Sequence, residues 1–128
     1  MKSLKYQKGV ELFNKIHGGL SAEKIASDLQ EVSPEIVTLI IEWIYGDLYA
    51  DQAIDLRTRE ISNISALVAT GSLPQLRNHI YAALKQGLSF EEIKHIILNV
   101  AIVAGFPRAI DAMMVLKEIR ESLNHTEH

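Results

Sequence analysis

The sequence contains no cysteine among its 128 residues. This absence excludes disulfide bonds, thiolate nucleophiles, cysteine-ligated zinc and iron–sulfur clusters. It also excludes a thiol peroxidase or a disulfide reductase, because both reactions need a pair of redox-active sulfurs. A chain without cysteine suits a reducing compartment, and we expect a cytoplasmic protein.

Long hydrophobic runs are missing as well. The most apolar stretches, Ile36 to Ile44 and Ile93 to Ala104, are shorter than the ~20 residues that a membrane span needs. The first ten residues, Met1 to Val10, are polar and contain lysine, unlike a secretory signal. We therefore expect no membrane partner.

The sequence has no field of positive charge. Its formal net charge is −3, and the charges form no long block of one sign, so nucleic acid is a poor candidate partner. Leu20 to Tyr45 has core spacings similar to those of a helix-turn-helix. The second half of that segment, Pro34 to Tyr45, carries none of the basic or amide side chains that a recognition helix needs.

The residues that are present predict one all-α domain over residues 1–128. The composition, 48% hydrophobic and 23% charged, is typical of a globular protein, and the length is that of one domain. Alternation of apolar and polar residues is absent, so we expect no sheet. Capping residues, prolines and glycines divide the chain into a bundle of six or seven short helices. The predicted helices are Ser3 to Ile16, Ser21 to Leu29, Pro34 to about Tyr45, Asp55 to Thr70, Pro74 to Gly87, Ser89 to Gly105 and Pro107 to about Leu123.

Two segments are apolar on nearly every side. Ile96 to Ala104 is interrupted only by Asn99, and Ala109 to Leu116 continues the pattern. A helix that is apolar all round must be covered all round. It is either a central helix of one chain or a helix shared with a second subunit; in a domain this small we favour homo-oligomerisation.

One carboxylate falls on a predicted core face. On the helix after Asp55, Glu60 lies within the apolar arc, and His79 lies at the edge of the apolar face of the next helix. A Glu–His pair in a partly apolar pocket could transfer protons near neutral pH, with the carboxylate orienting and charging the imidazole. It could equally be a buried structural pair. In an ideal antiparallel hairpin the two residues lie at different heights, so contact requires a splayed connection or a second subunit.

Other polar residues have competing interpretations. Arg57 and Arg59 could hold a substrate carboxylate, or they could pair with Glu60, Asp55 or Glu42. We expect the remaining histidines to be solvated, and no pair of histidines has helical ligand spacing near a third ligand, so we predict no metal site. These histidines are His17, His95, His125 and His128.

The second half of the sequence resembles a known family. From Leu56 onward the chain reads LRTREISNISALVATGSLPQLRNHIYAALKQGLSFEEIKHIILNVAIVAGFPRAIDA. The TRE helix start, the ALVA-G turn, the QLR-H helix, the G-x-x-x-EEI capping turn and the AGFP-A helix occur in the order found in the carboxymuconolactone decarboxylase family. Upstream, Tyr45-Gly46-Asp47-Leu48-Tyr49 resembles an aromatic-Gly-acid-aromatic stretch of the same family.

The resemblance implies an all-α fold of the alkyl hydroperoxide reductase D-like (AhpD-like) type. It also implies a homo-oligomer, often a homohexamer built as a trimer of dimers. Related reductases use a CxxC pair with a nearby Glu and His as a proton relay. Here Ser72 and Gln75 stand in place of the two cysteines, whereas Glu60 and His79 match the acid and the histidine of that relay.

The resemblance further implies a lyase of aromatic catabolism that decarboxylates a small carboxylated lactone or a related acid. His79 would exchange the proton, Glu60 would orient it, Arg57 and Arg59 would anchor the substrate, and Tyr45 or Tyr49 would line the pocket. The enol intermediate can be stabilised by the substrate's own carbonyl, so no cofactor is expected. The alternative is a non-catalytic, oligomeric small-molecule-binding protein that retains the fold.

Overall fold

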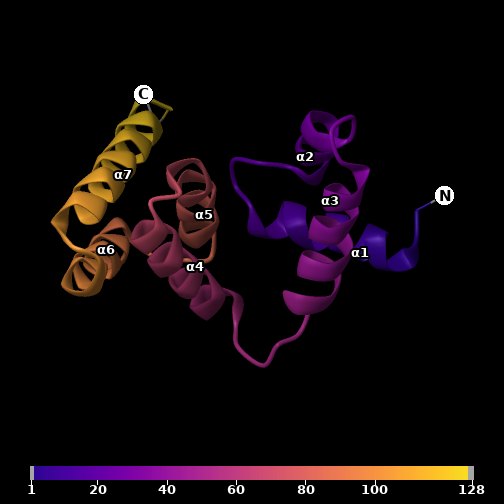
Figure 1. Cartoon of the computed structure of the whole chain (residues 1–128), viewed down its shortest axis with the longest axis horizontal. Helices are drawn as coiled ribbons and strands as arrows, with labels where there is room; N and C mark the ends of the chain where they lie inside the picture. The colour runs from indigo at the N-terminus through magenta and orange to yellow at the C-terminus, as the bar shows by residue number, and fades with distance from the viewer. Residues whose placement is uncertain (1, 127–128) are drawn as a thin grey trace. The chain divides into compact units, whose positions relative to one another are not determined.

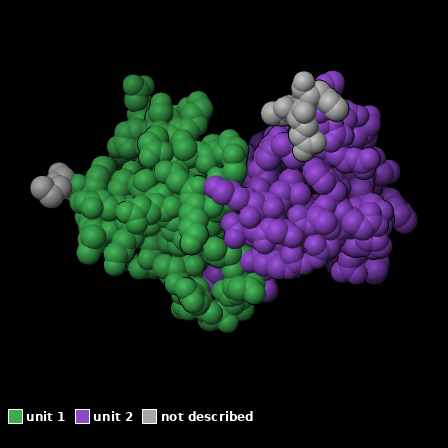
Figure 2. Space-filling model, turned by 180° about the vertical axis from the view of Figure 1, so that it is seen from behind, with its two compact units in different colours: residues 1–56 green, residues 57–128 purple. Residues whose placement is uncertain are grey.

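The structure is a computed structural model that describes residues 2–126. Every regular element within this range is a helix and none is a strand, which confirms the all-α prediction. The chain divides into two compact units, one ending at Leu56 and the other beginning at Arg57, coloured separately in Figure 2. We call them unit 1 and unit 2.

Unit 1 consists of four consecutive helical elements (Figure 1). They are α1 (Leu4–Ile16), α2 (Ala22–Leu29), α3 (Pro34–Thr38) and η1 (Leu39–Leu48). The side chains of Ser3, Ser21 and Ser33 cap α1, α2 and α3, each accepting a backbone N–H from the first turn. Because α3 continues directly into η1, the two form one continuous helical segment, and its η1 part packs against α1.

The element η1 is a π-helix, which the sequence did not predict. We expected an ordinary helix from Pro34 to about Tyr45. At η1 the backbone of α1 comes very close, because a Cβ added to Gly9 would lie 2.0 Å from the carbonyl oxygen of Ile41. Gly9 is therefore required for the packing of α1 on η1.

Unit 2 consists of four helices whose bounds follow the capping residues closely. They are α4 (Leu56–Thr70), α5 (Leu73–Lys85), α6 (Phe90–Ala104) and α7 (Phe106–Thr126). Gly71, Gly87 and Gly105 each have a positive φ between two helices. Ser89 and Glu92 form a capping box at the start of α6. The last helix is longer than expected, since it continues beyond Leu123.

The core of unit 2 is built from all four helices. On the apolar arc expected to face inward on α4, Ile64 and Val68 are fully buried, whereas Leu56, Ile61 and Leu67 are half-buried. On α5, Leu76 and Ile80 are fully buried. The apolar segments of α6 and α7 are buried on one side only. On the other side large apolar side chains are exposed: Leu98, Ile102, Val103, Phe106, Ile110 and Met114. Neither α6 nor α7 is therefore a central helix that the rest of the chain covers on all sides.

No helix within residues 2–126 has the length and hydropathy of a membrane span.

Candidate functional site

Glu60 of α4 and His79 of α5 form a direct pair within one chain. Oε2 of Glu60 lies 2.7 Å from Nδ1 of His79. The side chain of Glu60 is fully buried, and that of His79 is 16% exposed. Both residues belong to unit 2, so the pair needs no second subunit. The carboxylate is thus sheltered while the imidazole retains access to the surface.

Glu60 and His79 meet although an ideal antiparallel hairpin would place them at different heights. Glu60 lies about eleven residues before the turn at Gly71 and His79 about five after Pro74, which at ~1.5 Å per residue is a mismatch of about 9 Å. Figure 1 shows α4 and α5 inclined to one another rather than side by side along their length. Inclined helices can meet at points that lie at unequal distances from their connection. The splayed arrangement was one of the two routes to contact that the sequence left open.

The second carboxylate oxygen of Glu60 is buried without a hydrogen bond. Among the described residues, Oε1 has no partner, although its exposed area is essentially zero. Leaving a buried polar atom unsatisfied costs about 1–3 kcal/mol. Such an atom is a place where a water molecule, a proton or a ligand donor would be stabilised.

Arg57 and Arg59 precede Glu60 on α4. The guanidinium of Arg57 forms an ion pair with Glu92 of α6, which was not among the partners considered from the sequence. Because both side chains are about half exposed, this pair contributes little to stability. Arg59 is half-buried, with its Nε atom inside the protein. The structure therefore keeps two guanidinium groups on the helix that carries the acid.

Tyr45 and Tyr49 lie in unit 1, where they are buried. Their rings stack at a centroid distance of 4.7 Å and an interplanar angle of 17°. Tyr45 also packs edge-on against Phe13, at 4.6 Å. Both tyrosines therefore belong to the aromatic core of unit 1, and a pocket-lining role for them stays a prediction.

The expectation that His17 is solvated is wrong. His17 is 5% exposed, its Nε2 is hydrogen-bonded to the Tyr45 hydroxyl, and its ring lies 4.4 Å from that of Phe13. The sequence held a signal for this burial, since His17 follows Phe13 by four residues and Ile16 by one, which places it beside the apolar face of α1.

The other histidines differ from His17. His95 is 66% exposed and lies 3.4 Å from Glu91, and His125 is exposed, as expected. His128 lies outside the described residues. Within residues 2–126, no three His, Asp or Glu side chains gather as metal ligands would.

The geometry of the Glu60–His79 pair suits acid–base chemistry. A buried carboxylate on Nδ1 fixes the orientation of an imidazole and determines which ring nitrogen carries the proton. The opposite nitrogen, Nε2, is then the atom that can exchange a proton with a substrate. The same arrangement occurs in structural pairs, so the geometry defines a candidate site.

Comparison with known proteins identifies relatives of this chain. A sequence model of the carboxymuconolactone decarboxylase family matches residues 34–118. This range includes both members of the Glu60–His79 pair and extends across the boundary between the two units.

Three curated proteins illustrate the similarity. The 4-carboxymuconolactone decarboxylase of Acinetobacter baylyi is 24% identical, over 93% of this chain and 89% of its own length. The nitrosuccinic acid decarboxylase of Metarhizium robertsii is 25% identical, over 85% of this chain and 79% of its own length. A 15.0 kDa protein from the nqo9–nqo10 intergenic region of Paracoccus denitrificans is 29% identical, over 74% of this chain and 69% of its own length.

Proposed function

The chain belongs to the carboxymuconolactone decarboxylase family, and we propose that it is a cofactor-independent carboxy-lyase acting on a small carboxylated lactone or a related acid. The observation that supports this proposal most strongly is the 2.7 Å contact between a fully buried Glu60 and a partly exposed His79. A family-level decarboxylase function is also supported by two relatives that are named as decarboxylases.

In the proposed reaction the bond between the substrate carbon and its carboxylate breaks and carbon dioxide leaves. The electron pair of that bond moves into the neighbouring carbonyl of the substrate and gives an enolate. His79 then donates a proton from Nε2 to the carbon that lost the carboxylate, while Glu60 holds the ring through Nδ1. A positioned proton donor of this kind contributes about 10²–10⁴-fold to a rate.

The proton that Nε2 gives up must be replaced before the next turnover. Because Nδ1 keeps its own proton on Glu60, a water molecule must return the proton to Nε2 directly. Glu60 would thus act as the group that orients the imidazole, and His79 as the single acid.

The substrate class follows from the relatives and from the charge on α4. The names of the two decarboxylases each describe a small substrate that carries carboxylate groups. Arg57 and Arg59 are the proposed anchors for a carboxylate that stays on the substrate, because a guanidinium group matches a carboxylate with two parallel hydrogen bonds. Arg57 would have to exchange Glu92 for the substrate, and the exposure of that ion pair makes the exchange inexpensive.

Self-association is part of the proposal. Ile102, Val103 and Phe106 are 82%, 90% and 71% exposed, and a surface of this kind is typical of an interface. A homo-oligomer, assembled as a trimer of dimers on an AhpD-like fold, would cover it. We also retain the prediction that residues 1–128 form one domain, because the family match is continuous across both units.

One observation favours a second candidate function. Arg57 is already paired with Glu92, as expected if the site were no longer used for catalysis. The chain would then be an oligomeric small-molecule-binding protein that retains the fold.

A paired assay distinguishes the two functions. Carboxylated lactones, including 4-carboxymuconolactone, and small dicarboxylates are tested for carbon dioxide release and, in parallel, for thermal stabilisation of the protein. The lyase predicts that at least one compound both stabilises the protein and releases carbon dioxide. If some compounds stabilise the protein but none of them releases carbon dioxide, the chain is a binding protein instead.

A further inference from the structure

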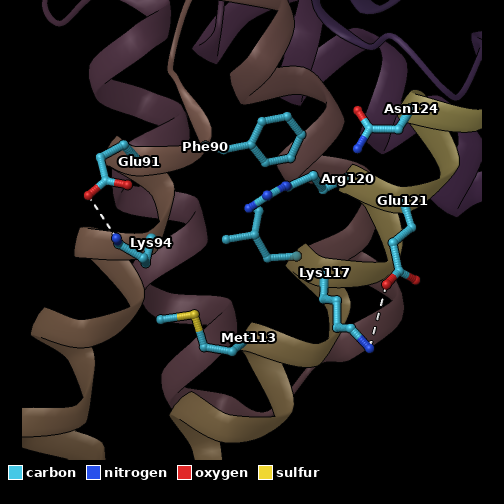
Figure 3. A pocket seen from close by; sticks show the side chains of 9 residues that line it. Phe90, Glu91, Lys94, Met113, Lys117, Arg120, Glu121 and Asn124 are labelled. Carbon is cyan, nitrogen blue, oxygen red and sulfur yellow. Dashed lines mark ion pairs between the residues drawn. The ribbon is translucent and has the colours of Figure 1, made fainter. Parts of the chain in front are cut away.

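We propose that a groove between α6 and α7 is a second ligand site, which takes a small amphipathic carboxylate with one charged group and an aryl or alkyl body. The groove lies in unit 2, between the first turns of α6 and the last turns of α7 (Figure 3). Its volume is about 450 Å³, within the range of small-molecule sites. It contains neither Glu60 nor His79, so it is independent of the proposed lyase function.

The floor of the groove is apolar. Leu116 is 7% exposed, and Phe90 and Met113 are half-buried, with all three packed into the core of unit 2. Their positions are set by that core rather than by a ligand, so the surface is formed before binding. Contact with this floor would remove an aryl or alkyl group from water, at about 25 cal/mol per Å² of apolar surface.

The rim of the groove carries three cationic and two acidic side chains. Lys94 pairs with Glu91 at 2.7 Å, and Lys117 pairs with Glu121 at 3.5 Å. The pKa of Glu91 is lowered by its hydrogen bond to Lys94, so this carboxylate stays ionised and neutralises the lysine. Arg120 takes part in no ion pair within residues 2–126. Among residues 2–126, one positive charge of the groove is therefore left without a counterion.

The unpaired charge faces the groove. In Figure 3 the guanidinium of Arg120 extends from α7 into the space between Phe90 and Met113, and the amide of Asn124 lies beyond it on the same helix. A guanidinium fork matches a carboxylate, and a neighbouring amide can supply a further donor. A single excess positive charge above an apolar floor fits a monoanion with an apolar body. It fits a phosphate dianion less well, because a dianion needs more hydrogen-bond donors.

The methionines make the site directly observable. Met113 lines the groove, whereas Met114 lines a separate cleft between α5 and α7. Protein labelled with ¹³C at the methionine methyl groups is titrated with 4-phenylbutyrate, and the same titration is made with 4-phenyl-1-butanol, which lacks the charge. We expect the Met113 methyl resonance to shift with the acid, the Met114 resonance to stay in place, and the alcohol to bind about tenfold more weakly.

Two variants test the role of the charge. Arg120→Gln should weaken binding of 4-phenylbutyrate about tenfold, which is the same difference that we expect between the acid and the alcohol in the wild type. The matched control Arg77→Gln removes an arginine that is paired with Glu118 outside the groove, and it should leave binding unchanged. His79→Ala should also leave the Met113 shift unchanged, because the groove does not include that residue.

Three results would overturn the proposal. One is the absence of a Met113 shift at millimolar acid. Another is equal binding of the acid and the alcohol, or of wild type and Arg120→Gln, which would reduce the groove to a nonspecific apolar surface. The third is loss of the Met113 shift in His79→Ala, which would mean that the signal originates at the Glu60–His79 pair.

Discussion

Replacing Glu60 with Gln separates the chemical role of the pair from its structural role. The substitution keeps the volume of the buried side chain but removes its charge. If the amide oxygen faces Nδ1 of His79, the amide NH₂ occupies the buried position of Oε1, an atom that accepts no hydrogen bond from the described residues. If the amide is turned round, its NH₂ donates to Nδ1, and the imidazole proton is forced onto Nε2.

The expected change in stability is small. A charge-assisted hydrogen bond is worth about 1.5–3 kcal/mol, and an ordinary hydrogen bond about half of that. The loss of roughly 1 kcal/mol is offset because the neutral amide costs less to bury than a carboxylate with one unsatisfied oxygen. We therefore expect the free energy of unfolding of Glu60→Gln to lie within about 1 kcal/mol of the wild-type value.

The expected change in activity is large. The neutral amide cannot stabilise the positive charge of the imidazolium as the carboxylate does. In the orientation in which its NH₂ donates to Nδ1, it also moves the imidazole proton from Nδ1 to Nε2. We expect kcat for decarboxylation to fall by about 100-fold, with little change in KM. Urea unfolding and steady-state carbon dioxide release provide the two measurements, with Glu11→Gln, an exposed carboxylate on α1, as the control. A Glu60→Gln variant that loses more than about 3 kcal/mol of stability yet keeps the wild-type kcat would show that the pair is structural.

Three further predictions concern packing, pH and assembly. Gly9→Ala places a Cβ against the backbone of Ile41. Although alanine has the better helix propensity, we expect this clash to destabilise the protein by about 1–3 kcal/mol in thermal or urea unfolding. Unchanged stability would contradict the close approach of the two helices. The pKa of Glu92 is lowered by a backbone hydrogen bond in the capping box and then by Arg57, so its contribution to stability is present above the ordinary glutamate value and is lost as the pH falls through the lowered value. Glu92→Gln should therefore be less stable than wild type in urea at neutral pH, and the difference should shrink as the pH falls below the ordinary glutamate value; a difference independent of pH would be inconsistent with this sign. Val103→Glu should lower the molar mass measured by light scattering if the exposed apolar surface is an oligomer interface, whereas a monomeric wild type would rule out self-association through it.

The helices could be predicted because their ends are marked locally. Ser33 before Pro34 and Ser89 three residues before Glu92 cap helices that begin as expected, and Gly105 ends α6. These signals involve side chain and backbone within one turn, so no knowledge of the fold is needed. The π-helical form of η1 has no such marker, since its hydrogen bonds differ from those of an α-helix only in the partner carbonyl.

Contacts between helices were predicted less well. The burial of Glu60 followed from helical periodicity, but its meeting with His79 depended on the inclination of α4 to α5, which no local pattern encodes. Arg57 pairs with Glu92 of α6, 35 positions away in the sequence. The partners expected from the sequence were the nearer acids Glu60, Asp55 and Glu42. His17 was misjudged because its polarity was given more weight than its spacing from Phe13.

The proton-transfer role of His79 is tested most directly by one measurement. Carbon dioxide release from 4-carboxymuconolactone, or from whichever acid the wild type accepts, is compared between wild type, His79→Ala and the neighbouring control Asn78→Ala on the same helix. We expect kcat to fall by about 10²–10⁴-fold in His79→Ala and to stay near the wild-type value in Asn78→Ala. A folded His79→Ala variant that turns over substrate at the wild-type rate would contradict that role.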